Sequence, residues 1–132
     1  MEALLVPEKT TVTAKGDGPA IELKSAQNRV FLLTLTITNI IEQESLDVSI
    51  FASSDGSAWE PKPVASFAQQ FYRSETPLLL DLSGRDVNFI RAHWEVNRWG
   101  RGDETPMFEF HVALREVPPE ILQEAVSRAK AN

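Results

Sequence analysis

Residues 30–41 read VFLLTLTITNII, in which every odd position from Phe31 to Ile37 is apolar and threonines stand at positions 34, 36 and 38. Successive side chains of a β-strand point to opposite faces of the sheet, so a period of two is typical of a strand with one buried face. β-branched and aromatic residues, which strands favour, dominate the segment. It predicts a long strand that lines a hydrophobic core.

The same alternation recurs along the chain, in the segments Leu46–Ala52, Leu78–Leu82, Ile90–Val96 and Phe108–Leu114. Shorter strands are expected at Thr10–Ala14 and Ala20–Leu23. Segments rich in Gly, Asp, Ser and Pro separate the strands and predict turns at 15–19, 53–56, 83–84 and 100–103. Several short strands with such turns indicate an antiparallel β-sandwich, jelly-roll-like, in which each sheet buries one face.

Two segments depart from this pattern. Residues 65–72 fit a strand through Ala65, Phe67 and Phe71, and they fit a helix face as well; we predict a strand. After Pro118-Pro119 the apolar residues follow helical spacing, which predicts a short C-terminal α-helix with the stripe Ile121, Leu122, Ala125, Val126 and Ala129. A helix of about 12 residues is marginal alone in water, so this stripe is expected to pack on the sandwich or on a neighbouring subunit. The predicted division is a sandwich domain, 1–117, and a helical tail, 118–132.

Composition excludes several classes of protein. The chain has 132 residues, enough for one domain, and carries a net charge of −6, which disfavours binding to nucleic acid or to an anionic membrane. It contains no cysteine, so disulfides, zinc ribbons and thiol nucleophiles are excluded. The first apolar run is four residues long and follows an acidic residue, which predicts neither a signal peptide nor a transmembrane segment. The expected location is the cytoplasm or an assembled particle.

Catalytic motifs are missing as well. The sequence has no Gly-x-Ser-x-Gly elbow, P-loop or dinucleotide fingerprint, so we expect no enzyme and no cofactor. The histidines His93 and His111 fall on the polar phase of adjacent predicted strands. A hairpin turning near Gly102 would place them opposite each other, where they could bind a divalent metal and serve a small metal-dependent enzyme. A solvated polar ladder is the interpretation that we favour.

Several side chains are candidates for contacts with a partner. Arg98, Trp99 and Arg101 form a predicted loop-tip cluster, and a solvent-facing Trp flanked by Arg is typical of an interface. Phe51 is aromatic on an otherwise polar strand face, and Tyr72 is expected nearby. The tail residues Ile121, Leu122 and Val126 complete the set.

Three sequence elements carry a resemblance. They are the strand Leu46–Ile50 running into the hairpin Ser53–Trp59 with its Ser-x-Asp-Gly-x-x-Trp spacing, Leu80–Leu82 followed by Val87–Trp94, and the closing strand Pro106–Val112. In this order they are similar to small β-sandwich virion components of tailed phages and prophages, and to discoidin-type jelly rolls that bind glycans. The resemblance covers about residues 46–117 and implies a virion structural subunit or a glycan-binding domain.

The sequence therefore predicts a non-catalytic structural or binding module that self-associates, such as a virion or particle-surface subunit. The alternative is a carbohydrate-binding module, which requires an exposed aromatic platform of Trp99 with Trp59 or Tyr72.

Overall fold

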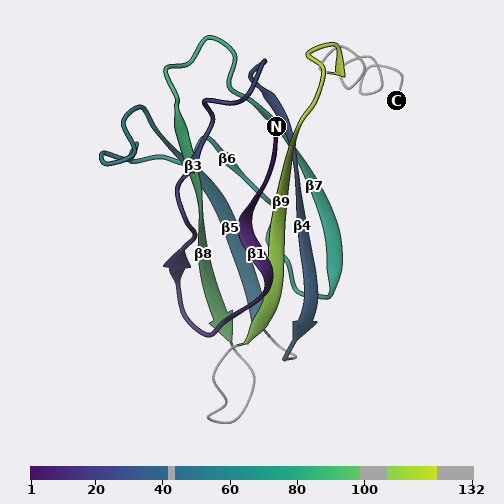
Figure 1. The fold of residues 1–132 in the computed structure, drawn as a ribbon. Coiled ribbons are helices and arrows are strands. Elements are labelled where there is room, and N and C mark those ends of the chain that lie inside the picture. Colours follow the sequence, from purple (N-terminus) through teal and green to yellow (C-terminus); the bar gives the residue numbers. More distant parts are fainter. Residues whose placement is uncertain (42–43, 99–106, 122–132) are drawn as a thin grey trace.

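The computed structural model describes residues 1–41, 44–98 and 107–121, and these residues form an all-β, antiparallel structure (Figure 1). One sheet has the strand order β1-β9-β4-β7 and the other has the order β2-β8-β5-β6, with β3 also paired to β8. The strands are β1 (Glu2–Val12), β2 (Gly16–Asp17), β3 (Ile21–Glu22), β4 (Val30–Ile40), β5 (Glu44–Ser53), β6 (Ala65–Ser66), β7 (Ser74–Asp81), β8 (Phe89–Arg98) and β9 (Phe108–Glu116).

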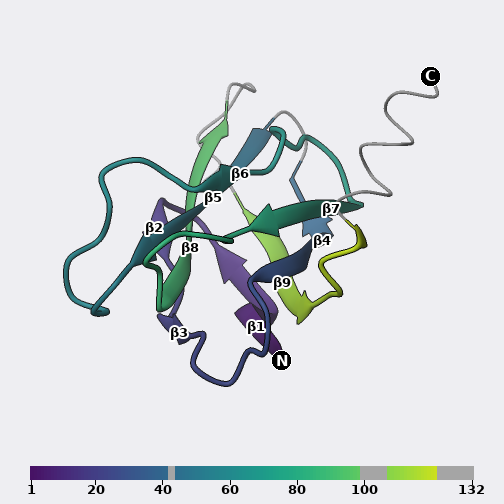
Figure 2. The ribbon, with the colours of Figure 1, turned by 90° about the horizontal axis from the view of Figure 1, so that it is seen from above.

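The two sheets pack face to face as a β-sandwich, and Figure 2 shows them as separate layers. The alternation read from the sequence explains the core. Odd positions of β4 and even positions of β5, β8 and β9 are buried between the sheets. The largest fully buried side chains are Phe31, Phe108 and Phe110, all from the first sheet.

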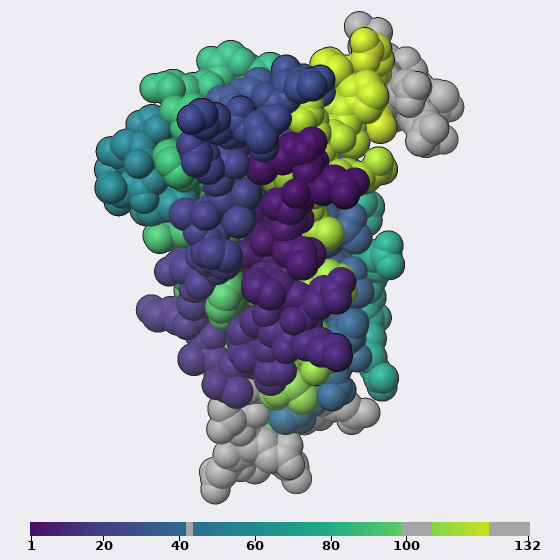
Figure 3. All heavy atoms as spheres, in the orientation of Figure 1, coloured from purple at the N-terminus to yellow at the C-terminus, as the bar shows by residue number. Residues whose placement is uncertain are grey.

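Trp94 connects the two sheets with the N-terminal part of the chain. Its ring meets that of Phe110 in the opposite sheet edge to face, with centroids 5.7 Å apart, and its Nε1 donates to the carbonyl of Ala14 at 3.1 Å. The segment beside the indole contains Gly18, where a Cβ would lie 2.6 Å from the carbonyl oxygen of Leu5. Backbone therefore approaches backbone too closely there for any other residue. In the space-filling view, β1 and the segment up to β3 cover this side of the sandwich (Figure 3).

Three local predictions need correction. The first strand begins at Glu2 rather than Thr10, because a bulge between Val6 and Thr10 breaks the period of two that the sequence analysis used. Residues 15–19, predicted as a turn, contain the short strand β2. The predicted strand 65–72 is reduced to β6 and one isolated bridge between Leu46 and Gln70.

The predicted fold class is wrong in its C-terminal helix. The elements of the described residues include no helix, and the chain after β9 turns at Pro118, where the amide of Ile121 donates to the Pro118 carbonyl at 3.1 Å. The ring of Pro119 disfavours the helical conformation of Pro118, so the residues directly after β9 form a turn. Leu122 and Val126 lie outside the described residues.

Candidate functional site

The outer face of the β1-β9-β4-β7 sheet carries apolar side chains in one half, toward the end of β9. Side chains that point away from the core in this sheet come from paired positions of the four strands. We call this surface the apolar face and define it by Leu4, Leu32, Pro77, Leu79 and Ala113. Leu4 is 40% exposed, and the other four side chains are half-buried or exposed.

A groove of about 440 Å³ crosses this face. It lies around the small side chain of Ala113, with Leu4 on one neighbouring strand and Leu32 and Thr34 on the other. Glu2 and Arg115 lie at its upper end, where β9 ends in Figure 1. The groove is therefore a shallow apolar depression with charged side chains at one end.

Both edge strands of this sheet contain a proline. Pro77 lies in the middle of β7, opposite Thr34, and Pro7 lies in the bulge of β1. Lys9 in this bulge has a φ of 62°, and the hydroxyl of Thr10 donates to the Pro7 carbonyl at 2.6 Å. Proline and bulges hinder the addition of another strand at an edge. A partner is therefore better accommodated on the face of this sheet than along its edges.

The outer face of the second sheet is polar and aromatic. His93 Nδ1 lies 2.9 Å from Asp17 Oδ1, and its ring meets the ring of Phe51 edge to face at 5.8 Å. The guanidinium of Arg91 lies 3.8 Å from the same Asp17 oxygen and stacks 4.3 Å from the centroid of the Trp59 ring. These groups contact one another within the chain, while the buried Nε of Arg91 has no hydrogen-bond partner among the described residues.

The loop after β5 positions Trp59. The buried hydroxyl of Ser53 donates to the Ala58 carbonyl at 2.6 Å and accepts from the amide of Gly56 at 2.8 Å. Asp55 Oδ1 accepts from the amides of Ala58 and Ser57, and these hydrogen bonds lower the pKa of Asp55. The Ser-x-Asp-Gly turn expected from the sequence is thus present and holds the indole over β8.

The predicted pair of histidines is not formed. β8 and β9 belong to different sheets, so the hairpin expected near Gly102 is wrong, and His93 and His111 point outward from opposite sides of the sandwich. The cause is that the chain crosses from one sheet to the other between β8 and β9. β8 pairs with β5, where His93 lies beside Ser49, and β9 pairs with β4, where His111 lies beside Thr36. No group of three or more His, Asp or Glu side chains among the described residues has a metal-binding arrangement.

The predicted contact residues lie in separate places. Phe51 lies on the polar face, Tyr72 is 75% exposed between β6 and β7, and Arg98 ends β8 opposite Glu44. Ile121 is half-buried in the turn after β9. Trp99, Arg101, Leu122 and Val126 lie outside the described residues.

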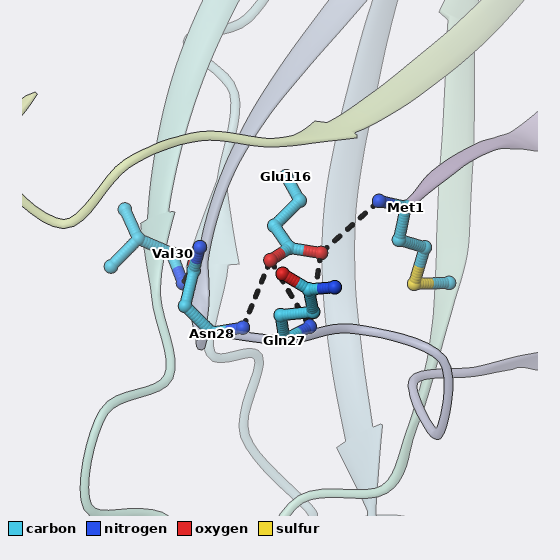
Figure 4. Close-up of polar contacts among 5 residues, drawn as sticks. All are labelled: Met1, Gln27, Asn28, Val30 and Glu116. Atoms are coloured by element: carbon cyan, nitrogen blue, oxygen red, sulfur yellow. Dashed lines mark hydrogen bonds and ion pairs between the residues drawn. The ribbon is translucent and has the colours of Figure 1, made fainter.

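Glu116 holds together the N-terminus and the loop before β4 (Figure 4). One carboxylate oxygen accepts from the Met1 α-amino group at 3.1 Å, and the other accepts from the amides of Gln27 and Asn28 at 3.1 and 2.9 Å. The ammonium is the main cause that lowers the pKa of Glu116 below its ordinary value of 4.5; burial opposes it and the two amides add to it.

Replacing Glu116 by Gln is expected to lower the melting temperature at neutral pH and to have a smaller effect in acid. A carboxylate whose pKa falls on folding contributes stability above its unfolded pKa, and this contribution is lost as pH falls through the folded value. Thermal unfolding of both proteins at pH 7 and near pH 3 measures the difference, with the exposed Glu75→Gln as control. A difference in melting temperature that does not change with pH would contradict this role.

Sequence reasoning missed the buried acid Glu44, the half-buried acid Glu116 and the apolar face. Glu44 is 1% exposed, and its carboxylate accepts from the amides of Ile41 and Met107 at 2.8 and 3.0 Å. Glu44 and Glu116 each stand at one end of a strand, where a carboxylate can bind free backbone amides of neighbouring loops. Leu4 belongs to four consecutive apolar residues, Ala3–Val6, in which a period of two does not show which side chains point outward.

Comparison with known proteins shows no family. No protein-family model matches the chain, and no curated protein matches it. Among solved structures, a chain of "Structure of infectious bursal disease virus Gx strain" is similar with a TM-score of 0.49 and 11% identity. The match covers 86% of this chain and 31% of that chain, so this chain spans less than a third of its length. A likeness at this level carries no inference about function. Among the described residues no helix is long and apolar enough to cross a membrane.

Proposed function

We propose that the chain is a non-catalytic structural module that associates with further copies of itself through the apolar face. The observation that supports this proposal is Leu4, a large apolar side chain 40% exposed on a sheet whose other face is the core. Contiguous apolar patches on a protein surface mark interaction sites, whereas scattered apolar residues do not. Leu32, Leu79 and Ala113 make this patch contiguous across the four strands.

The size of the face suits a contact between folded domains. Its strands have 8 to 11 residues. At ~3.3 Å per residue and ~4.8 Å between strands, the whole outer face of this sheet, its polar and charged parts included, measures roughly 15 by 30 Å. A stable interface buries roughly 800 Å² of accessible surface per partner. Side chains make the accessible area of such a face larger than its planar area. The accessible area of this outer face is therefore of the same order as the area that each partner buries in a stable interface.

A subunit of a virion or of another particle surface is the finer form of this proposal. The strand orders β1-β9-β4-β7 and β2-β8-β5-β6 support a jelly-roll arrangement of the sandwich. Electron microscopy of the concentrated protein tests this form, since closed or regular assemblies are expected.

The platform of the carbohydrate-binding alternative centres on Trp99, which lies outside the described residues, so the structure compares only Trp59 with Tyr72. Trp59 stacks on Arg91, whose partner in β5 is Phe51. Tyr72 lies two residues after Gln70, whose partner in β5 is Leu46, near the other end of the strand. Phe51 and Leu46 are five residues apart in β5, which corresponds to roughly 16 Å along the strand. Trp59 and Tyr72 therefore do not form one platform.

Replacing Leu4 by Lys is expected to weaken self-association by at least tenfold in Kd, because one ammonium would enter an apolar contact. Size-exclusion chromatography with light scattering measures the mass of each variant, and circular dichroism checks its fold. Asn97→Lys adds the same charge to the exposed polar face and is expected to keep the wild-type mass. If Leu4→Lys associates like the wild type, the apolar face is not the contact.

A further inference from the structure

The outer face of the β1-β9-β4-β7 sheet changes from apolar to polar along its strands. From the end of β9 downward, the first two levels of paired outward side chains are Glu2, Arg115, Leu32 and Leu79, and then Leu4, Ala113, Thr34 and Pro77. The next levels are polar and include two acidic side chains, Glu75 beside Thr36 and Glu109 on β9. The apolar face therefore lies directly below the point where the chain leaves the sheet (Figure 1).

A turn follows β9 at this end of the sheet. The amide of Val117 still donates to the carbonyl of Val30 in β4, and the amide of Ile121 then donates to the Pro118 carbonyl, which changes the direction of the chain. The segment 122–132 comes after this turn and lies outside the described residues. At ~3.3 Å per residue it can span up to about 36 Å. This length is sufficient to cross the outer face of the sheet.

The order of residues in this segment matches the order of the levels on the face. Its apolar residues come first and its basic residues follow, namely Leu122, Ala125 and Val126, then Arg128 and Lys130. A chain that runs down the face from the turn would bring its apolar part to the apolar face and its basic part to Glu75 and Glu109. The acidic residue Glu124 falls in the part that would pass Arg115.

We propose that the segment 122–132 covers the apolar face of its own chain, running from the turn toward Glu109, and so competes with a second copy for this face. The inference rests on the proposed function, since it names what regulates the same surface. A segment tethered by a short linker to the surface it binds has an effective concentration in the millimolar range. A second copy must overcome this advantage to displace the segment, so association is weaker than the apolar face alone would give.

The docking is tested in the monomer, independently of association. In the full chain, Leu122→Ser/Val126→Ser is expected to shift the methyl NMR signals of Leu4 and Leu32 in a dilute sample, because these side chains would lose their apolar cover. The methyl signals of Ile50, buried in the second sheet, are expected to keep their positions. Unchanged signals of Leu4 and Leu32 would overturn the inference. A difference that disappears on further dilution would also overturn it, because the segment would then lie on a second copy.

Charge reversal tests the direction in which the segment crosses the face. Arg128→Glu/Lys130→Glu is expected to shift the same methyl signals, because Glu75 and Glu109 would then repel the segment. The additional changes Glu75→Lys/Glu109→Lys are expected to return the signals toward their wild-type positions, because the charges are complementary again with reversed sign. Signals that stay displaced in the fourfold variant would contradict this direction.

The competition is tested by sedimentation velocity. Leu122→Ser/Val126→Ser is expected to strengthen self-association at least threefold in Kd, since the apolar face would be free for a second copy. Gln123→Ser/Asn132→Ser, two polar exchanges in the same segment, is the control and is expected to keep the wild-type Kd. An unchanged or higher Kd of Leu122→Ser/Val126→Ser would contradict this inference and leave the proposed function standing. If all three proteins stay monomeric up to millimolar concentration, the proposed function fails, and the NMR comparison still decides where the segment lies.

Discussion

Replacing Trp94 by Ala is expected to lower the free energy of unfolding by about 3–5 kcal/mol, which is a large part of the stability of a domain of this size. The indole is only 9% exposed and fills the space between the sheets against Phe110. Its loss would also leave the Ala14 carbonyl without its donor and remove the ring that packs against Gly16. Urea unfolding followed by circular dichroism measures the change.

Trp59→Ala is the matched control for this substitution. Trp59 is half-buried on the outer surface, stacked on Arg91 rather than packed between the sheets. The substitution is expected to lower the free energy of unfolding by about 1 kcal/mol or less, since an exposed stacking contact of this kind contributes about 0.5–1 kcal/mol. Equal losses in the two variants would show that Trp94 does not bridge the sandwich in solution.

Replacing Glu44 by Ala is expected to lower the free energy of unfolding by about 2–3 kcal/mol. The Met107 amide would lose its carboxylate acceptor, and the Ile41 amide would keep only the longer bond of 3.3 Å to the Met107 carbonyl. A buried amide without an acceptor costs about 1–3 kcal/mol. The same urea titration measures the loss, and the exposed Glu75→Ala, expected within about 0.5 kcal/mol of wild type, is the control. A loss no larger than that of the control would mean that Glu44 does not join these loops.

Period-two alternation predicted the longer strands well, because the pattern of a strand is local. Phe31–Ile37 and Phe108–Leu114 are buried on the faces that the sequence indicated. Strand pairing is not local, and this explains the error at β8 and β9. These strands follow each other in the chain, yet they pair in different sheets. Alternation says which face of a strand is buried but not which strand lies beside it.

The candidate site was harder to predict for the same reason. The candidates predicted from the sequence are unusual side chains, such as Phe51 and Tyr72, whereas the apolar face consists of ordinary leucines, a proline and an alanine on the outer phase of several strands. Leu32 belongs to that face only because β7 and β9 lie on either side of β4, which brings Leu79 beside Leu32 and Ala113 beside the neighbouring Thr34. Glu116 likewise acts through residues about 90 positions away in sequence, which no local pattern indicates.

The most direct test of self-association through the apolar face is sedimentation velocity of the unmodified chain over a wide range of concentration. We predict a mass that rises from monomer to dimer or larger species as the concentration increases. A single monomeric species from micromolar to millimolar concentration would contradict the account.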